Sequence, residues 1–263
     1  LKEYFGNTWK IEMLRSFISK WRVRFSRNFK NTIRYCDYIL VTNHDTKLMA
    51  ENSNRGNTEK ISFVPDTAVP PSMQQIPFTK KDVTGKIKIL WVGRFLPRKG
   101  LNLILDALSQ VPKDIDYSFT IVGGGEQFHL LDSWIEKYGI DRSKLNICGQ
   151  LPFHEVIQHY QQADAFAFCS LRDSFAAQLI EAMAFGLPII TLDIHGASIG
   201  VPDNCGIKVP VTTKEATVSG IARAIEKICT DHTFRNECSV NAFEKSKMYT
   251  WENKINSVTS KFY

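Results

Sequence analysis

The stretch of residues 170–190, SLRDSFAAQLIEAMAFGLPII, places two carboxylates, Asp173 and Glu181, eight positions apart. Small residues follow the first acid, and an apolar helical run carries the second, so a loop opens a helix here. A helix start offers free backbone N–H groups and the positive end of the helix dipole, which favour anions. Glu181 needs a partner or a ligand unless it lies on the outer face of its helix. The stretch is therefore a candidate site for an anion and for sugar hydroxyls.

Two cations occur in the segment VGRFLPRKG. Arg94 directly follows an expected strand and Lys99 stands at the mouth of the next helix, so both can reach one phosphate group. Taken alone, the pair fits solvated loop cations equally well. Further along, Gly123-Gly124-Gly125 either lets backbone approach a ligand or makes a plain tight turn. Its spacing does not match the dinucleotide fingerprint, so NAD is not indicated.

The elements that must position these residues alternate between strand and helix. Strands are expected at residues 87–92, 117–122, 145–148, 165–168, 187–191 and 206–209, with helices between them. This order predicts an α/β fold, a Rossmann-like parallel sheet with helices on both faces. Ligands bind such sheets beyond the carboxyl ends of the strands. The candidate residues all follow strands, so we expect them at one edge.

The N-terminal segment has a different character. Residues 1–36 hold nine of the 33 Lys and Arg residues and two acids, whereas the remainder is nearly neutral. Residues 8–35 lack Gly and Pro and repeat apolar residues every three or four positions, which predicts one helix. Such a helix either packs on its own domain or lies on an anionic membrane surface, and the two are compatible. No nucleic-acid module follows it, so nucleic-acid binding is not indicated.

Short strands at residues 38–42 and 61–64 flank a helix at 46–51, with Asn43 or Asp45 as its cap. The Pro-rich residues 65–85 predict a linker and a domain boundary. The sequence holds no apolar run long enough to span a membrane and no signal-peptide pattern. Residue 1 is Leu, so we expect the start to be a fragment boundary. The six cysteines form no CxxC pair, which favours reduced thiols in a cytoplasmic protein over disulfides or zinc.

The segments GRFLPRKG, IVGGGE and NICGQLPFHEVIQHYQQADAFAFCSLRDSFAAQLIEAMAFGLPII resemble the C-terminal half of family 4 glycosyltransferases. These are retaining enzymes of the GT-B fold, which is built from two facing Rossmann-like domains. The resemblance covers about residues 60–210. It implies a nucleoside diphosphate sugar, UDP- or GDP-linked, as donor substrate, and neither a metal nor another cofactor.

The resemblance also implies roles for single residues. Arg94 and Lys99 would bind the diphosphate, Asp173 the hydroxyls of the donor sugar, and Glu181 the ribose, with the first three acting in catalysis. Other donor-site positions would be Gly93, Gly123, the base-lining Ile147, Gln150 and Leu151, and the helix-mouth residues Phe175, Ala176, Ala177 and Gln178. Two departures matter: Asp173 is shorter than the commoner Glu, and Ala176 replaces a Gly, which makes φ > 0 harder there.

The domain organisation follows from this resemblance. Residues 1–83 would be the remnant of an acceptor domain, 84–245 the nucleotide-sugar domain, and 246–263 a helix packing back towards the N-terminal segment. The family's catalytic-side histidine would come from a part of the acceptor domain that we expect to lie outside these residues.

We expect a hexosyltransferase acting on a glycan or lipid-linked acceptor, as in cell-surface polysaccharide synthesis. The basic helix would bring it to the inner face of the membrane. Two alternatives stay open. The short N-terminal region favours a non-catalytic or regulatory subunit that needs a partner chain, and the shared fold also allows a nucleotide-sugar isomerase.

Overall fold

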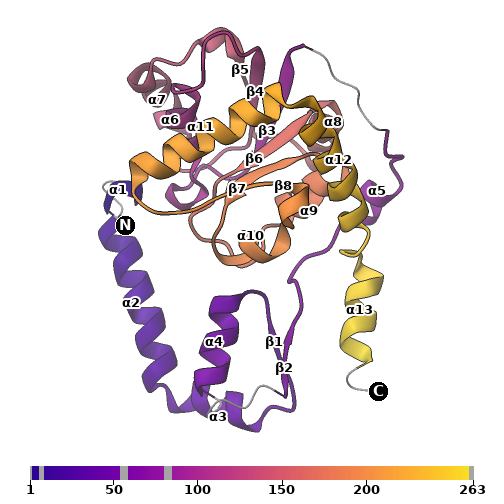
Figure 1. Ribbon diagram of the computed structural model, residues 1–263. Coiled ribbons are helices and arrows are strands. Elements are labelled where there is room, and N and C mark those ends of the chain that lie inside the picture. Colours follow the sequence, from indigo (N-terminus) through magenta and orange to yellow (C-terminus); the bar gives the residue numbers. More distant parts are fainter. Residues whose placement is uncertain (1, 6–8, 54–58, 80–84, 261–263) are drawn as a thin grey trace.

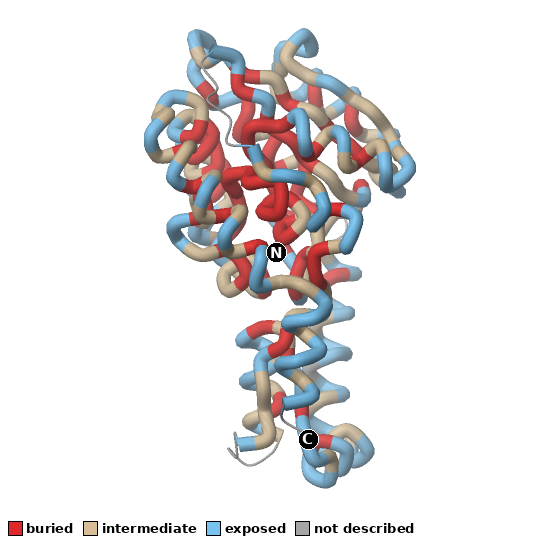
Figure 2. Tube along the Cα trace, turned by 90° about the vertical axis from the view of Figure 1, so that its right-hand side faces the viewer, coloured by how far each residue is buried: buried red, intermediate tan, exposed pale blue. Residues whose placement is uncertain are grey.

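The computed structural model describes residues 2–5, 9–53, 59–79 and 85–260. A large α/β unit lies above a smaller N-terminal unit made of α2, α3, β1, α4 and β2 (Figure 1). Buried residues are concentrated in the large unit, whereas the N-terminal unit is mostly exposed (Figure 2). The large unit therefore holds the main hydrophobic core.

A six-stranded parallel sheet forms the centre of the large unit, which confirms the predicted fold class. Its order is β5-β4-β3-β6-β7-β8, and every neighbouring pair is parallel. The central strands β6 and β7 are buried at every position, as expected for a sheet covered on both faces. The strands are β3 (Ile87–Val92), β4 (Tyr117–Val122), β5 (Leu145–Gly149), β6 (Ala165–Phe168), β7 (Ile189–Leu192) and β8 (Gly206–Val209).

Helices cover the two faces of the sheet and form two apolar clusters with it. Ile104 of α6 and Ile225 of α11 contribute to one cluster, and Ile180 of α9 to the other. Each buried side chain of this size contributes roughly 1.5–3 kcal/mol by leaving water. The helices of the large unit are α5 (Pro71–Gln74), α6 (Leu101–Leu108), α7 (Leu131–Tyr138), α8 (Phe153–Gln162), α9 (Ala177–Ala184), α10 (His195–Gly200), α11 (Lys214–Thr230) and α12 (His232–Ser246).

The N-terminal unit differs from the prediction in one respect. The expected single helix is two helices, because the Ser26 side chain accepts from the backbone N–H of Phe29 and starts a new helix. The predicted strands and the predicted helix between them are present, and Asn43 caps that helix by accepting from the Thr46 N–H. The elements are α1 (Lys2–Phe5), α2 (Trp9–Phe25), α3 (Arg27–Tyr35), β1 (Ile39–Val41), α4 (His44–Ser53) and β2 (Ile61–Phe63).

The connection between the two units is packed rather than free. Val69 and Met73 are each 1% exposed and belong to the second apolar cluster, and the Val69 N–H bonds the Tyr249 carbonyl at 2.7 Å. This part of the predicted linker therefore packs against the large unit, and the domain boundary expected within it stays a prediction. Residues 80–84 of the expected linker lie outside the described residues.

The two ends of the chain behave differently. Tyr4 in α1 is buried in the first apolar cluster, and its hydroxyl donates to the Thr212 carbonyl at 2.9 Å, so the start of α2 is anchored on the large unit. The last helix, α13 (Trp251–Thr259), has no buried residue. That it packs on the N-terminal segment stays a prediction. No helix within the described ranges combines the length and apolar character needed to cross a bilayer.

Candidate functional site at the sheet switch point

The site lies where the sheet reverses its winding. β3 and β6 are neighbours, and the chain leaves them toward opposite sides of the sheet, which opens a crevice beyond their carboxyl ends. The turn Pro97–Lys99 follows β3, and the loop with Asp173 follows β6. The topology thus brings together two segments that are 74 residues apart in the chain.

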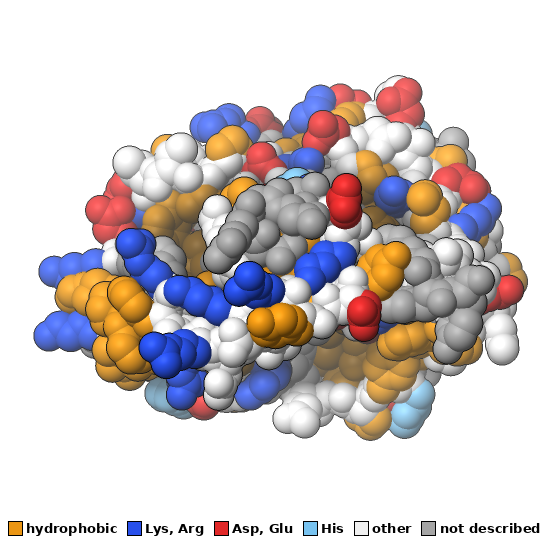
Figure 3. Space-filling view, turned by 90° about the horizontal axis from the view of Figure 1, so that it is seen from below, with side chains coloured by type: hydrophobic (Ala, Val, Ile, Leu, Met, Phe, Trp, Pro, Cys, Tyr) orange, Lys and Arg blue, Asp and Glu red, His pale blue; other side chains and the backbone are white. Residues whose placement is uncertain are grey.

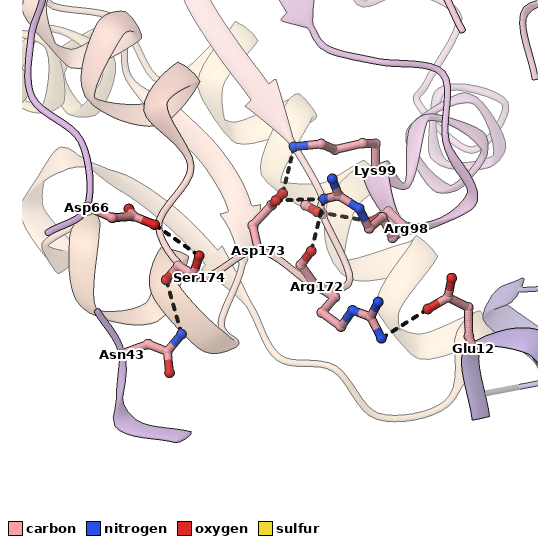
Figure 4. A network of polar contacts seen from close by, with 9 residues as sticks. Glu12, Asn43, Asp66, Arg98, Lys99, Arg172, Asp173 and Ser174 are labelled. Carbon is pink, nitrogen blue, oxygen red and sulfur yellow. Dashed lines mark hydrogen bonds and ion pairs between the residues drawn. The ribbon is translucent and has the colours of Figure 1, made fainter. Parts of the chain in front are cut away.

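Asp173 is held by two cations, one for each carboxylate oxygen. Lys99 Nζ lies 2.8 Å from Oδ2, and Arg98 Nη1 lies 2.7 Å from Oδ1 (Figure 4). Lys99 is only 6% exposed, and its ammonium lies 4.8 Å from the centre of the Phe168 ring. Burial lowers the pKa of Lys99, while the carboxylate of Asp173 opposes that shift. The predicted residues Lys99 and Asp173 therefore meet.

Arg94 stands beside this cluster without joining it. Its side chain is exposed, and within the described part of the chain it has no acidic partner. Its positive charge nevertheless contributes to lowering the pKa of Lys99, so the two cations lie within electrostatic range. Arg98, which the sequence analysis passed over, occupies the place beside Asp173. Its position next to Lys99 at the helix mouth was the feature of the sequence from which it could have been predicted.

The loop that carries Asp173 is tied to the N-terminal unit on both sides. Arg172 Nη1 forms an ion pair with Glu12 Oε2 of α2 at 3.0 Å. The Ser174 carbonyl accepts from Asn43 Nδ2 at 3.3 Å, and its hydroxyl donates to Asp66 at 3.2 Å (Figure 4). The two residues that flank Asp173 thus contact three segments: α2, the residue before α4 and the segment after β2.

The mouth of α9 is formed without strain. Ala176 is the N-cap with φ −78° and ψ 118° and has no side-chain cap, so an Ala is accommodated where the resemblance led us to expect difficulty. Ala177 and Gln178 begin the helix, whose first N–H groups have no partner within the helix. Phe175 is buried and packs edge-on against Tyr249. The geometry suits an anion or a polar ligand at this helix start.

Glu181 lies in the second turn of α9, and its side chain has a partner in the protein. The hydroxyl of the buried Tyr160 donates to Glu181 Oε2 at 3.0 Å. Burial raises the pKa of Glu181, and the hydrogen bond from Tyr160 partly offsets this. Burial likewise raises the pKa of Tyr160. This pair could not be predicted from spacing, because Tyr160 belongs to α8 and Glu181 to α9.

Close backbone packing requires a glycine at position 123, directly after β4. A Cβ on Gly123, at φ +137°, would lie 1.8 Å from the Gly93 carbonyl oxygen. The Gly123 N–H bonds the Gly149 carbonyl at 2.7 Å, so the ends of the strands are linked. This accounts for Gly123 without a ligand, and the contact of Gly93 and Gly123 with the donor stays a prediction. Of the expected base-lining residues, Gln150 is exposed while Ile147 and Leu151 are partly buried against the two apolar clusters.

A cavity of about 1250 Å³ lies between α2, α4 and the loop of Asp173. His195 lines it and has φ 51°, which makes it the one non-glycine residue with positive φ among those described. Its Nδ1 pairs with Asp45 Oδ2 of α4. Basic side chains from the N-terminal unit, those of Arg15, Arg24 and Lys30, also line the cavity. No three His, Cys, Asp or Glu side chains within the described ranges gather as a metal site would require.

The fold defines a Rossmann-like domain with a cluster of two cations and one carboxylate at its switch point. Residues 72–245 match the family described as glycosyl transferases group 1, and the chain belongs to that family. The GPI3 subunit of phosphatidylinositol N-acetylglucosaminyltransferase from Saccharomyces cerevisiae is 25% identical over 229 residues, which are 81% of this chain and 49% of the yeast protein. The chain spans about half the length of the curated relatives it matches, 46% in one case and 49% in another.

Two solved structures share the fold. HepE from Anabaena, in complex with UDP, superposes with a TM-score of 0.72 at 18% identity. The match covers 93% of this chain and 68% of the HepE chain. A chain of the GtfA/B complex superposes with a TM-score of 0.76 at 17% identity. The match covers 90% of this chain and 47% of that other chain.

Proposed function

We propose that the protein transfers a hexose from a nucleoside diphosphate sugar to a glycan or lipid-linked acceptor, with retention at the anomeric carbon. The observation that carries this proposal is the cluster of Lys99, Arg98 and Asp173 at the switch point, with the exposed cation Arg94 beside it. The family membership supports it, as does the UDP complex of a protein with the same fold.

In this proposal, the cations and the mouth of α9 bind the diphosphate. Asp173 would contact the hydroxyls of the transferred sugar, and Glu181 the ribose. As the bond between the anomeric carbon and the diphosphate oxygen breaks, its electron pair stays on the diphosphate. Lys99, Arg94 and the helix start would stabilise that growing charge, which is the kind of electrostatic assistance that contributes most in many enzymes. Side-chain cations would do this in place of a metal ion.

Titration calorimetry with UDP and with GDP tests the donor site. We expect one of them to bind, and Arg94→Ala and Lys99→Ala each to weaken binding by about tenfold, because each removes a charge-assisted contact worth roughly 1.5 kcal/mol. Arg142→Ala is the matched control, since Arg142 is an exposed arginine paired with Asp132 elsewhere on the surface. If folded protein binds neither nucleotide, the proposal is wrong.

A second candidate function is that of a subunit that needs a partner chain for transfer. The names of one relative and one structure support it, because one is a subunit and the other a two-component complex. Transfer by the isolated chain, measured as product formed from a UDP-sugar, would exclude this candidate. A chain that binds UDP but transfers nothing alone would favour it.

We also propose contact with an anionic membrane surface through the N-terminal helices. Large apolar side chains of α2 are exposed, including Phe17 at 65% and Phe25 at 58%. Arg22, Arg24 and Arg27 are exposed among them. On the face seen from below, Lys and Arg side chains interleave with apolar ones (Figure 3). This combination is typical of helices that lie on anionic lipid.

A further inference from the structure

Arg98 is arranged like a ligand-binding residue rather than a solvated loop cation. Its guanidinium contacts Asp173 Oδ1 at 2.7 Å and donates to the Arg172 carbonyl at 3.1 Å. It therefore approaches the same carboxylate as Lys99, from the other oxygen (Figure 4). A planar guanidinium and an ammonium that hold one anion between them are also a suitable pair for a phosphate group.

The surroundings of Lys99 leave little room for a second anion. Its ammonium has the ring of Phe168 on one side, 4.8 Å away, and Asp173 Oδ2 on another, 2.8 Å away, and the residue is almost fully buried. A buried ammonium without a counter-ion is costly, so Asp173 stabilises Lys99 in this arrangement. A phosphate oxygen that reaches Lys99 would take the position that Oδ2 holds.

The charges at the site favour such an exchange. Arg98 and Lys99 share the single carboxylate of Asp173, and the charge of Arg94 also acts on Lys99, so positive charge is in excess here. A diphosphate carries more negative charge than a carboxylate and can contact both Arg98 and Lys99, so it would neutralise the cluster better.

We propose that Arg98 is a further diphosphate-binding residue, and that the donor diphosphate displaces Asp173 from Arg98 and Lys99. The displaced carboxylate is then free to accept hydrogen bonds from the hydroxyls of the transferred sugar. Asp173 thus serves first as an internal counter-ion and then as a sugar ligand. This inference rests on the proposed donor site and adds a residue and an order of events to it.

If the diphosphate displaces Asp173, substitutions of Arg98 and of Asp173 should change nucleotide affinity in opposite directions. Arg98→Ala removes a phosphate contact and should weaken binding of UDP, or of GDP where that is the nucleotide bound, by about tenfold. Arg98→Lys should restore part of the loss, because it keeps the charge but not the fork. Asp173→Asn removes the competing anion and should tighten the same nucleotide severalfold. A carboxylate with a purely structural role would not give tighter binding when it is neutralised.

Titration calorimetry on the full chain tests this, with UDP and GDP as probes and thermal melting to show that each variant is folded. Arg142→Ala and Asp132→Asn are the matched controls, because this exposed pair has the same chemistry at 2.6 Å, and both should bind like the parent. Unchanged affinity in folded Arg98→Ala overturns the role of Arg98. Unchanged or weaker affinity in folded Asp173→Asn overturns the displacement.

The outcomes separate this inference from the proposed function. A parent chain that binds neither UDP nor GDP refutes both. A parent that binds, together with Arg98 and Asp173 variants that behave like their controls, refutes the inference alone. If Arg98→Ala does not fold, Arg98→Lys and Asp173→Asn still decide it, because neither removes the bulk of the side chain.

Discussion

Asp173 and Glu181 carry the same charge in opposite surroundings. Asp173 has a cation on each oxygen, whereas Glu181 has a phenol hydroxyl and apolar neighbours. Burial therefore raises the pKa of Glu181, so ionisation of this buried carboxyl lowers the free energy of unfolding. Such a cost is tolerated where a ligand needs the carboxylate, which is consistent with the proposed ribose contact.

Glu181→Gln tests this cost. Because the folded-state pKa is raised above the unfolded value, the free energy of unfolding should fall as pH rises from below the ordinary Glu pKa through the folded-state one. Gln can still accept from Tyr160 but carries no charge, so the variant should lose this pH dependence and be more stable at neutral pH. Urea unfolding over a series of pH values measures both effects. Glu136→Gln, at an exposed helical position, is the control, and equal pH slopes for the parent and Glu181→Gln would contradict the argument.

Gly123→Ala tests the packing of the strand ends. The added Cβ would meet the Gly93 carbonyl oxygen at 1.8 Å, at a φ of +137° that side chains rarely adopt. We expect a loss of about 3 kcal/mol in the free energy of unfolding, since strain and a backbone clash add. Gly139→Ala is the matched control: it also has positive φ but nothing within 4 Å of the new Cβ, so it should cost only about 1 kcal/mol. Equal losses in thermal or urea unfolding would show that the clash is relieved cheaply.

Between elements, the ion pair of Glu12 and Arg172 links α2 to the loop of Asp173. Glu12 is 7% exposed and also pairs with Arg15 at 3.0 Å, so its charge is shared by two arginines. The pair joins the N-terminal unit to the candidate site across 160 residues of sequence, as do Asn43 and Asp66 through Ser174. The position of the N-terminal unit is thereby coupled to the geometry of the site.

A double-mutant cycle with Glu12→Gln and Arg172→Gln measures this coupling. We expect a coupling free energy of about 1 kcal/mol in unfolding, because one partner is buried and contacting residues are not additive. The exposed pair of Lys227 and Asp231, at 2.9 Å, is the control and should couple by only about 0.3–0.5 kcal/mol. A coupling for Glu12 and Arg172 no larger than that of the control pair would show that α2 and the loop are energetically independent.

Local patterns predicted the sheet but not the contacts between distant segments. The strands β3 to β8 could be predicted because apolar runs alternate with helical periods, and that alternation dictates a parallel sheet. The helix break at Ser26 was missed because apolar spacing continues across it, and only the hydroxyl reveals the new start. Lys99 and Asp173 could be predicted from their places at the ends of strands. The partners Arg98, Tyr160 and Glu12 follow from side-chain directions and packing, which no spacing in the sequence specifies.

In the whole molecule, the strand-end cluster and the basic, aromatic surface belong to different units. The large unit encloses the strand-end cluster, while the N-terminal unit carries the basic and aromatic side chains on the face seen from below (Figure 3). The cavity beside Asp173 is lined partly by basic residues of that N-terminal unit, among them Arg24 and Lys30. In the function that we propose, an acceptor held at an anionic surface approaches the donor site from this side.

Vesicle sedimentation tests the proposed surface. We expect the chain to bind phosphatidylglycerol-containing vesicles and not pure phosphatidylcholine vesicles. Arg22→Gln combined with Arg24→Gln should weaken binding roughly 30-fold, since each basic residue near an anionic surface contributes about 1 kcal/mol. Added salt should weaken the parent in the same direction. Lys113→Gln with Arg142→Gln removes two exposed cations from the large unit and should leave binding unchanged. Equal losses in both double variants would mean that net charge, rather than the N-terminal helices, governs binding, and this surface would lose its role as the contact with lipid.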